Sequence, residues 1–129
     1  MTKTKILNTF KDKRGSISDI IYKDNINHIT LIKSKKNVIR GNHYHKKSTQ
    51  YAYVTKGKLE YYYKNINNKK SRVKKIVLKE NEMVLTKPGI AHAFKTITNN
   101  EFLVFSKGIR GGKDYEKDTY RLEKKLIIE

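Results

Sequence analysis

Two histidines separated by one residue, His43 and His45, are the residues of this chain best suited to chemistry. They lie in the stretch R-G-N-H-Y-H-K-K-S-T-Q-Y-A-Y-V-T-K-G, from Arg40 to Gly57, and make up half of the chain's four histidines. In a β-strand, alternate side chains point to the same face, so both imidazoles would share one pocket, with Cα atoms roughly 6.5 to 7 Å apart. Imidazole has an ordinary pKa of about 6.5, which suits proton transfer near neutrality. It also suits binding of a metal ion.

Three further side chains in this stretch could act in the same pocket. A turn over residues 46–49 leads into a second predicted strand, in which Gln50 and every second residue after it share a face and close on the histidines. Gln50 can donate and accept hydrogen bonds there, or bond the backbone as a buried amide. Arg40 has a planar guanidinium that suits an anionic group, and equally a surface salt bridge. Tyr53 would serve as a proton donor or a stacking wall if it points inward.

The composition predicts one ordinary domain. The chain has 129 residues and no cysteine, which excludes a disulfide framework, a thiolate metal site and a cysteine nucleophile. We expect a single domain over residues 1–129, with a core over about 5–107 and a tail over 108–129. The first residues, M-T-K-T-K-I-L, lack the apolar core of a signal peptide, and no run approaches the roughly 18 apolar residues of a membrane span. We therefore expect a cytoplasmic protein that does not enter the membrane.

The net charge of +18 would ordinarily indicate nucleic acid or an anionic surface as a partner. However, the charge comes from 25 lysines against 5 arginines, and the lysines are scattered in pairs along the chain. Dispersed pairs in turns are typical of solvated surfaces. Nucleic-acid binding is therefore not the expected function, whereas a generally positive field could attract a small anionic substrate.

Alternating apolar residues and frequent turn signals predict an all-β sandwich or small barrel. Lys87-Pro88-Gly89 has the chemistry of a tight turn, and His92 follows it. Residues 101–106, with F-L-V-F, have the pattern of a strand that is buried on both faces. A short helix is expected near 120–125. The predicted strands cover residues 6–10, 16–21, 28–32, 40–45, 50–54, 59–63, 72–78, 83–85, 92–96 and 101–106.

Two motifs resemble those of the cupin superfamily. Its first motif has the form G-x5-H-x-H followed by an acidic residue and a glycine, and here His43-Tyr44-His45 is followed by Gln50 and Gly57. Its second has the form P-x-G-x2-H, and here P-G-I-A-H covers residues 88–92. The resemblance spans most of residues 40–94. It implies an all-β fold: a single cupin domain, built as a double-stranded β-helix or jelly-roll barrel, with a short irregular or helical C-terminal tail.

Within the cupins, R-G-N-H-Y-H-K with Gln50 resembles the 3,4-ketoisomerases of dTDP-4-keto-6-deoxyglucose. Residues 14–16, Arg-Gly-Ser, are similar to the start of that group and of the dTDP-4-dehydrorhamnose 3,5-epimerases. R-G-N-H-Y-H is also similar to the cupin domain of capsular-polysaccharide reductases, whose equivalent pocket holds zinc. The chain departs from the ketoisomerases at Ile29 and Thr30, where they carry a tyrosine, and it has Gln50 where metal-dependent cupins commonly carry a glutamate.

The resemblance implies an isomerase or epimerase of a dTDP-4-keto-6-deoxyhexose, in surface polysaccharide or glycan biosynthesis. It would be a homodimer that binds a nucleotide sugar and needs no cofactor. Proton transfer next to the carbonyl would fall to His43 and His45, and substrate binding to Arg40, Gln50, His92 and Tyr53. One alternative is a metal-dependent cupin enzyme that holds Zn, Fe, Mn or Ni with His43, His45, Gln50 and His92. Another alternative is a sugar-binding cupin without catalytic activity.

Overall fold

The computed structural model describes residues 3, 4, 6, 8–109, 112–114 and 116–128. Strands dominate this part of the chain, and its one helical element is a single 3₁₀ turn. The elements are β1 (Lys3–Thr4), β2 (Asn8–Asp12), β3 (Gly15–Ser18), β4 (His28–Ser34), β5 (Ile39–Tyr44), β6 (Thr49–Lys56), β7 (Leu59–Asn65), β8 (Lys74–Leu78), β9 (Met83–Thr86), β10 (Ile90–Thr96), β11 (Asn100–Lys107), η1 (Gly112–Asp114) and β12 (Tyr120–Arg121).

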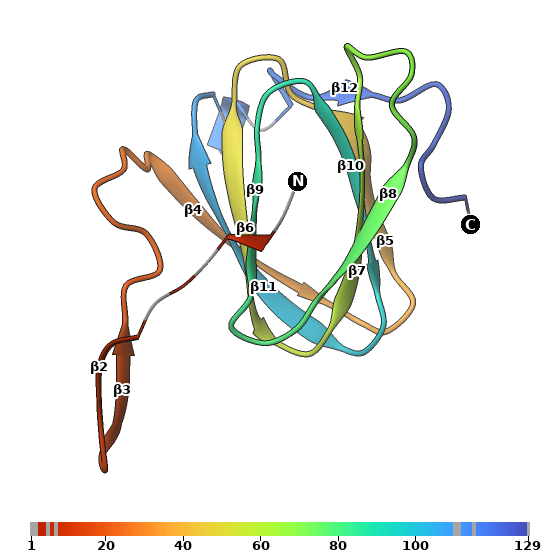
Figure 1. Ribbon diagram of the computed structural model, residues 1–129. Coiled ribbons are helices and arrows are strands. Elements are labelled where there is room, and N and C mark those ends of the chain that lie inside the picture. Colours follow the sequence, from red (N-terminus) through yellow and green to blue (C-terminus); the bar gives the residue numbers. More distant parts are fainter. Residues whose placement is uncertain (1–2, 5, 7, 110–111, 115, 129) are drawn as a thin grey trace.

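Two five-stranded sheets pack face to face and enclose the interior of the molecule (Figure 1). The first sheet has the strand order β1-β9-β6-β11-β4, and the second has the order β12-β5-β10-β7-β8. Every ladder between the described strands is antiparallel. Neighbours in a sheet are mostly far apart in sequence, as in a jelly roll. The all-β prediction is confirmed.

The interior is built by the period-two alternation that the sequence shows. Along β6, Gln50, Ala52 and Val54 are buried, whereas Tyr51 and Tyr53 face outward and are half-buried. The same alternation runs through β7 and β11. The buried apolar side chains from both sheets form one cluster of Ala52, Val54, Leu59, Tyr61, Tyr63, Leu78, Val84, Phe102 and Val104.

Strand β11 differs from the prediction that it is buried on both faces. Its buried and half-buried residues alternate, with Phe102 and Val104 inside and Leu103 and Phe105 outside. The reason is that the described residues place no further layer on the outer face of the first sheet. The apolar run therefore produces a half-exposed apolar surface instead of a second core.

The N-terminal hairpin of β2 and β3 extends away from the two sheets (Figure 1). It exposes Phe10 by 50% and Ile17 by 62%. The strand predicted over 6–10 corresponds to β2, shifted by two residues, and residue 7 lies outside the described residues. The strand predicted over 16–21 corresponds to β3, which ends earlier, at Ser18.

The short helix predicted near residues 120–125 is wrong. Tyr120 and Arg121 form β12, which pairs with β5 at the edge of the second sheet. The Tyr120 ring stacks on Tyr44 at a centroid distance of 5.3 Å, and the ammonium of Lys46 lies 4.1 Å from the Tyr120 ring centroid. Pairing with a distant strand thus overrides the local helical propensity.

Candidate active site

Three imidazoles converge between the two sheets. The spacing of His43 and His45 predicts this for two of them, and the resemblance to the cupin motifs implies it for His92. His43 lies near the end of β5, His45 follows that strand, and His92 lies on β10 directly opposite His43. The ring centroids are 4.9 Å apart for His43 and His45, 4.7 Å for His43 and His92, and 5.3 Å for His45 and His92. His45 and His92 are 2% and 1% exposed, so the cluster lies inside the molecule.

Backbone carbonyls fix the orientation of two of these rings. The Nδ1 atom of His45 lies 2.7 Å from the carbonyl oxygen of Asp118, and Nδ1 of His92 lies 3.0 Å from that of Ile90. Because a carbonyl oxygen only accepts, each Nδ1 must carry the proton and donate it. Nε2 of both rings therefore presents a lone pair when the rings are neutral.

Asn42 is the extra residue of a β-bulge in β5, opposite the boundary between His92 and Ala93 of β10. Regular alternation would turn Arg40 and His43, three residues apart, to opposite faces. The bulge turns both side chains to the inner face of the sheet, where both line one cavity. The R-G-N-H sequence therefore brings a guanidinium and an imidazole into the same space.

Glycine is required beside this bulge. Gly41 has a φ of +92°, and a Cβ atom at this position would lie 2.9 Å from the carbonyl oxygen of His92. Only a residue without a side chain tolerates both the left-handed backbone and this close approach. Asn42 also has a positive φ, of 58°, which asparagine adopts more readily than most residues.

The side chain of Asn42 fastens the C-terminal tail to β5. Its Oδ1 accepts hydrogen bonds from the backbone N–H groups of Leu126 at 2.9 Å and Ile127 at 3.2 Å, and its Nδ2 donates to the carbonyl of Ile127 at 3.1 Å. The backbone carbonyl of Asn42 accepts from the N–H of Leu122 at 3.0 Å. The motif that carries the histidine thus also docks the tail.

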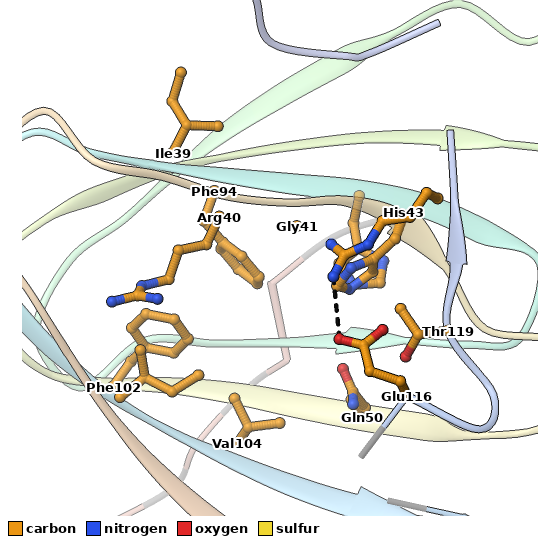
Figure 2. A pocket seen from close by; sticks show the side chains of 13 residues that line it. Ile39, Arg40, Gly41, His43, Gln50, Phe94, Phe102, Val104, Glu116 and Thr119 are labelled. Atoms are coloured by element: carbon orange, nitrogen blue, oxygen red, sulfur yellow. Dashed lines mark hydrogen bonds and ion pairs between the residues drawn. The ribbon is translucent and has the colours of Figure 1, made fainter. Parts of the chain in front are cut away.

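A cavity of about 340 Å³ opens beside the histidine cluster. His43 and His92 line it, whereas His45, which is also buried, does not. Figure 2 shows His43 and Gln50 at one end of the cavity and Arg40 at the other. Between the two ends, the lining is apolar and consists of Ile32, Phe94, Phe102 and Val104. A ligand with a polar ring at one end and an anionic group at the other would match this division.

Gln50 points into this cavity from β6. It is 7% exposed, and its Nε2 has no hydrogen-bond partner among the described residues. A buried amide without a partner is destabilising, by about 1 to 3 kcal/mol, unless a ligand or water satisfies it. Gln50 is therefore well suited to bind a ligand oxygen.

Arg40 lies at the opposite end with part of its guanidinium already bound. Its Nε donates to Ser34 Oγ at 2.8 Å, and its Nη2 donates to the carbonyl of Lys33 at 3.3 Å. These two bonds hold the group at the cavity wall, and a guanidinium has five N–H donors in all. Arg40 can therefore bind an anion while it remains anchored.

Tyr53 does not line the cavity, so the prediction that it binds substrate there is wrong. Its hydroxyl donates to Asn81 Oδ1 at 2.8 Å on the outer side of the first sheet, and partial burial raises its pKa. The alternation that points Gln50 inward necessarily points Tyr53 outward. The fourth histidine, His28, lies near Thr30 at the start of β4 and is also outside the cavity lining.

The tail contributes three lining residues that the sequence analysis missed, Glu116, Thr119 and Arg121. They lie beyond the glycines at 111 and 112, in a charged segment whose pattern predicts neither a strand nor a site. No local sequence pattern could indicate that these residues line the cavity, because their placement depends on the pairing of β12 with β5, some 80 residues earlier in the chain.

Asp118 fixes this segment over the histidines. It is 4% exposed, and its carboxylate accepts hydrogen bonds from the backbone N–H groups of Lys46, Lys47 and Ser48 at 3.0, 2.9 and 2.7 Å. Burial by itself raises the pKa of Asp118, but these bonds together outweigh burial and lower it. The charged form is thus the one that holds the turn between β5 and β6.

A family model described as the polysaccharide biosynthesis C-terminal domain matches residues 10–120. The chain belongs to this family. The match includes all three clustered histidines and the tail residues up to Tyr120. No curated protein sequence matches the chain significantly.

Solved structures give this member of the polysaccharide biosynthesis C-terminal domain family a cupin jelly-roll fold. It resembles dTDP-4-dehydrorhamnose 3,5-epimerase from Sulfolobus tokodaii with a TM-score of 0.77 and 21% identity, over 98% of this chain and 77% of that one. It resembles a 3,4-ketoisomerase from Helicobacter canadensis with a TM-score of 0.73 and 23% identity, over 91% of this chain and 89% of that one. It also resembles the sugar 3,4-ketoisomerase QdtA from Thermoanaerobacterium thermosaccharolyticum in complex with TDP, with a TM-score of 0.71 and 22% identity, over 94% of this chain and 85% of that one. The prediction of a cupin jelly-roll fold is confirmed.

The same histidines of this family member fit a divalent metal ion. One ring nitrogen from each of His43, His45 and His92 lies within 4.8 Å of the other two. Metal-binding imidazoles commonly donate their second N–H to a carbonyl, as His45 and His92 do here. Gln50 lines the cavity beside them and offers an amide oxygen as a further ligand.

None of the helical structure in the described residues is long and apolar enough to span a membrane.

Proposed function

We propose that this protein is a sugar-nucleotide ketoisomerase or epimerase that acts on a dTDP-4-keto-6-deoxyhexose. The observation that carries the proposal is the arrangement of one cavity, with imidazoles and an amide at one end and the Arg40 guanidinium at the other. A sugar ring and a diphosphate have the same two-ended chemistry. The reaction belongs to the synthesis of surface polysaccharide or another glycan, in the cytoplasm, where the chain would meet a nucleotide sugar.

Relatives with the same fold support this choice of substrate. The structures that the chain resembles are sugar epimerases and 3,4-ketoisomerases, of which one QdtA structure contains TDP and another TDP-4-keto-6-deoxyglucose. The family description, polysaccharide biosynthesis, points to the same area of metabolism. The net charge of +18 suits an anionic nucleotide better than a neutral sugar, because a positive field raises the rate of encounter.

His43 is the base in this proposal. It lines the cavity, and it removes the proton from the carbon next to the carbonyl, which leaves an enediol-like intermediate. The catalytic task predicted for His45 becomes a positioning one, because His45 does not line the cavity and its ring centroid lies 4.9 Å from that of His43. Gln50 and His92 bind sugar oxygens, and Arg40 binds the diphosphate. No cofactor is needed for these steps.

A metal-dependent cupin enzyme is the second candidate, favoured by the two rings whose Nδ1 atoms are fixed by carbonyls. His43, His45, His92 and Gln50 would hold the ion. When bound, a divalent ion would polarise a substrate carbonyl as a Lewis acid. The residues of the chain would otherwise keep the same tasks, with Arg40 at the anionic end of the substrate.

Nuclear magnetic resonance of dTDP-4-keto-6-deoxyglucose incubated with the protein in D₂O distinguishes these candidates. Isomerised or epimerised product with deuterium at a ring carbon, formed in the presence of a chelator, supports the metal-independent enzyme. Product that appears only after addition of Zn²⁺ or Fe²⁺, together with a raised melting temperature, supports the metal enzyme. Binding without exchange of any ring hydrogen would contradict both and leave a sugar-binding cupin.

We also propose that the protein is a homodimer that buries the outer face of the first sheet. Ile29 and Leu31 on β4 are 59% and 51% exposed, and they pair with Phe105 and Leu103 on β11 to give a continuous apolar surface. The β2–β3 hairpin, which extends away from the two sheets, also favours a dimer. An isolated two-stranded hairpin is marginally stable in water, so contact with a second copy would stabilise it.

Light scattering of the purified protein tests this proposal. We expect a dimer, and we expect Leu31→Lys to produce a monomer because it places like charges across the interface. A matched change in the loop just before β8, Val73→Lys, should leave the dimer intact, since Val73 is also exposed, by 47%, but lies outside the first sheet. A wild-type monomer at micromolar concentration would contradict the proposal.

A further inference from the structure

The C-terminal segment from Glu116 to Arg121 forms one wall of the cavity, although it follows the last long strand. Glu116, Thr119 and Arg121 line the cavity, and Asp118 anchors the segment through three backbone N–H groups. Pairing of β12 with β5 adds a second anchor, because Arg121 lies directly opposite His43 in the ladder. The wall is therefore a fixed part of the site.

This wall places a carboxylate beside the histidines. Figure 2 shows Glu116 at the same end of the cavity as His43 and Gln50. The Arg121 Nη2 atom donates to Oε1 of Glu116 at 3.0 Å, and both side chains are more than half exposed. Glu116 is the only carboxylate among the described residues that line the cavity. An exposed ion pair of this kind contributes little stability, which leaves both groups available to a ligand.

Moving a carbonyl from C4 to C3 of a sugar requires two proton transfers of different kinds. One moves hydrogen between carbons, from C3 to C4, and an imidazole can do this from one face of the ring. The other moves a proton between oxygens, from the hydroxyl on C3 to the oxygen on C4. The second transfer needs a group that accepts from one oxygen and donates to its neighbour.

We propose that Glu116 performs the transfer between the two oxygens, held in place by Arg121 and by the Asp118 anchor. This inference rests on the proposed function. His43 takes the proton from C3, which gives an enediolate with the negative charge on the C4 oxygen. The Glu116 carboxylate accepts the proton of the C3 hydroxyl and delivers it to the C4 oxygen. His43 returns its proton to C4 as the new carbonyl forms at C3, so no proton is gained or lost overall.

The arrangement also selects one reaction of the two proposed above. Inversion of a ring carbon needs a proton donor on the face opposite the base, but the cavity lining away from His43 is formed by apolar side chains such as Phe94 and Phe102 and by Arg40, whose guanidinium binds the diphosphate in this proposal. The groups able to move protons gather at one end. The substrate class is therefore a 3-hydroxy-4-keto sugar nucleotide, and the product is the 4-hydroxy-3-keto isomer.

The experiment compares Glu116→Gln with wild type on dTDP-4-keto-6-deoxyglucose in D₂O, and follows recovered substrate and product separately. We expect product formation to fall roughly 100-fold to 1,000-fold, the usual contribution of one acid–base group. We expect exchange of the C3 hydrogen of recovered substrate to continue within about threefold of wild type, because His43 is intact. Glu116→Asp, which keeps the carboxylate, should recover part of the rate. The control is Glu123→Gln, which should behave as wild type because Glu123 is an exposed residue of the same tail that does not line the cavity.

Three results would overturn the inference, and they are distinguishable. If Glu116→Gln forms product at the wild-type rate, Glu116 has no catalytic task and the proposed function stands. If it loses exchange and product together at an unchanged melting temperature, the carboxylate acts in binding and not between the oxygens. If wild type neither exchanges nor isomerises the substrate, the proposed function fails and the inference fails with it.

Discussion

The two ends of the protein interior are built from the same strands but carry opposite chemistry. Along β6, the inward side chains run from Gln50 at one end to Val54 at the other, and along β10 they run from His92 to Thr96. At the apolar end, Val54, Leu59 and Leu78 are fully buried. At the polar end, the imidazoles and Gln50 surround a cavity. Four residues of a strand, about 13 Å, thus separate the part that stabilises the fold from the part that is suited to chemistry.

The polar end is tolerated because the apolar end stabilises the fold. Buried polar groups without partners, such as Nε2 of Gln50, reduce stability. A continuous apolar cluster across both sheets offsets that loss. Changes at the two ends should therefore separate activity from stability.

The largest effect is expected for His43→Asn at the polar end. Removal of the proposed base should lower isomerisation roughly 1,000-fold and abolish hydrogen exchange at C3, because asparagine has no titrating nitrogen. The free energy of unfolding should change by less than about 1 kcal/mol, since His43 is only partly buried. Product formation and urea unfolding measure the two quantities. A variant with near wild-type activity would remove His43 from the mechanism.

Leu59→Ala tests the apolar end. Leu59 is fully buried in the core cluster, so truncation should destabilise the protein by about 3 kcal/mol through lost burial and a residual cavity. The rate per folded molecule should stay unchanged, because Leu59 does not line the cavity. Chemical denaturation measures the loss of stability, and parallel assays measure the rate per folded molecule. A loss of rate at temperatures where the variant is fully folded would show that the two ends are coupled.

Asp118→Asn tests the anchor between the tail and the polar end. The amide presents N–H groups toward backbone donors, so we expect a loss of about 2 kcal/mol at pH 7. The pKa of Asp118 is lowered in the folded state, so its stabilising effect is complete above the ordinary value of 3.8 and is lost as pH falls through the folded value. The difference between wild type and variant should therefore shrink below about pH 4.

Urea unfolding between pH 3 and pH 7 measures this difference. Asp19→Asn, at an exposed position, provides the comparison and should show a smaller effect at every pH. A gap between wild type and Asp118→Asn that stayed constant down to pH 3 would mean that the carboxylate charge does not stabilise the tail.

The smallest effect is expected for Tyr61→Phe, at the boundary between the two ends. The Tyr61 hydroxyl lies 2.6 Å from Thr86 Oγ1, and its removal should lower stability by about 1 kcal/mol. Burial raises the pKa of Tyr61, so the hydroxyl stays neutral and the loss should be the same from pH 6 to pH 9. Thermal unfolding of both proteins across this range measures it. A loss that grew with pH would mean that the hydroxyl ionises in the folded protein.

Much of the fold was predictable because each strand carries its own pattern. Period-two alternation explains why Gln50 and every second residue after it point inward, and why the rings of Tyr61 and Tyr63 do so too. The residues Pro88 and Gly89 have the chemistry of the turn that precedes β10 and His92. The burial of β11 was predicted wrongly, since its sequence does not show whether a second layer covers the sheet. Tyr53 was misassigned although its own alternation with Gln50 indicates the outer face.

The all-β architecture and the shared pocket of His43 and His45 follow from the sequence alone, because local spacing decides which side chains share a face of a strand. The resemblance of residues 88–92 to the second cupin motif implied that His92 joins them. By contrast, pairing between β5 and β10 produces the bulge at Asn42 that turns Arg40 into the cavity. Docking of the tail likewise brings Glu116 to that cavity. Register and docking could not be read from the sequence because they arise from contacts between residues some 50 to 80 positions apart, which no local pattern encodes.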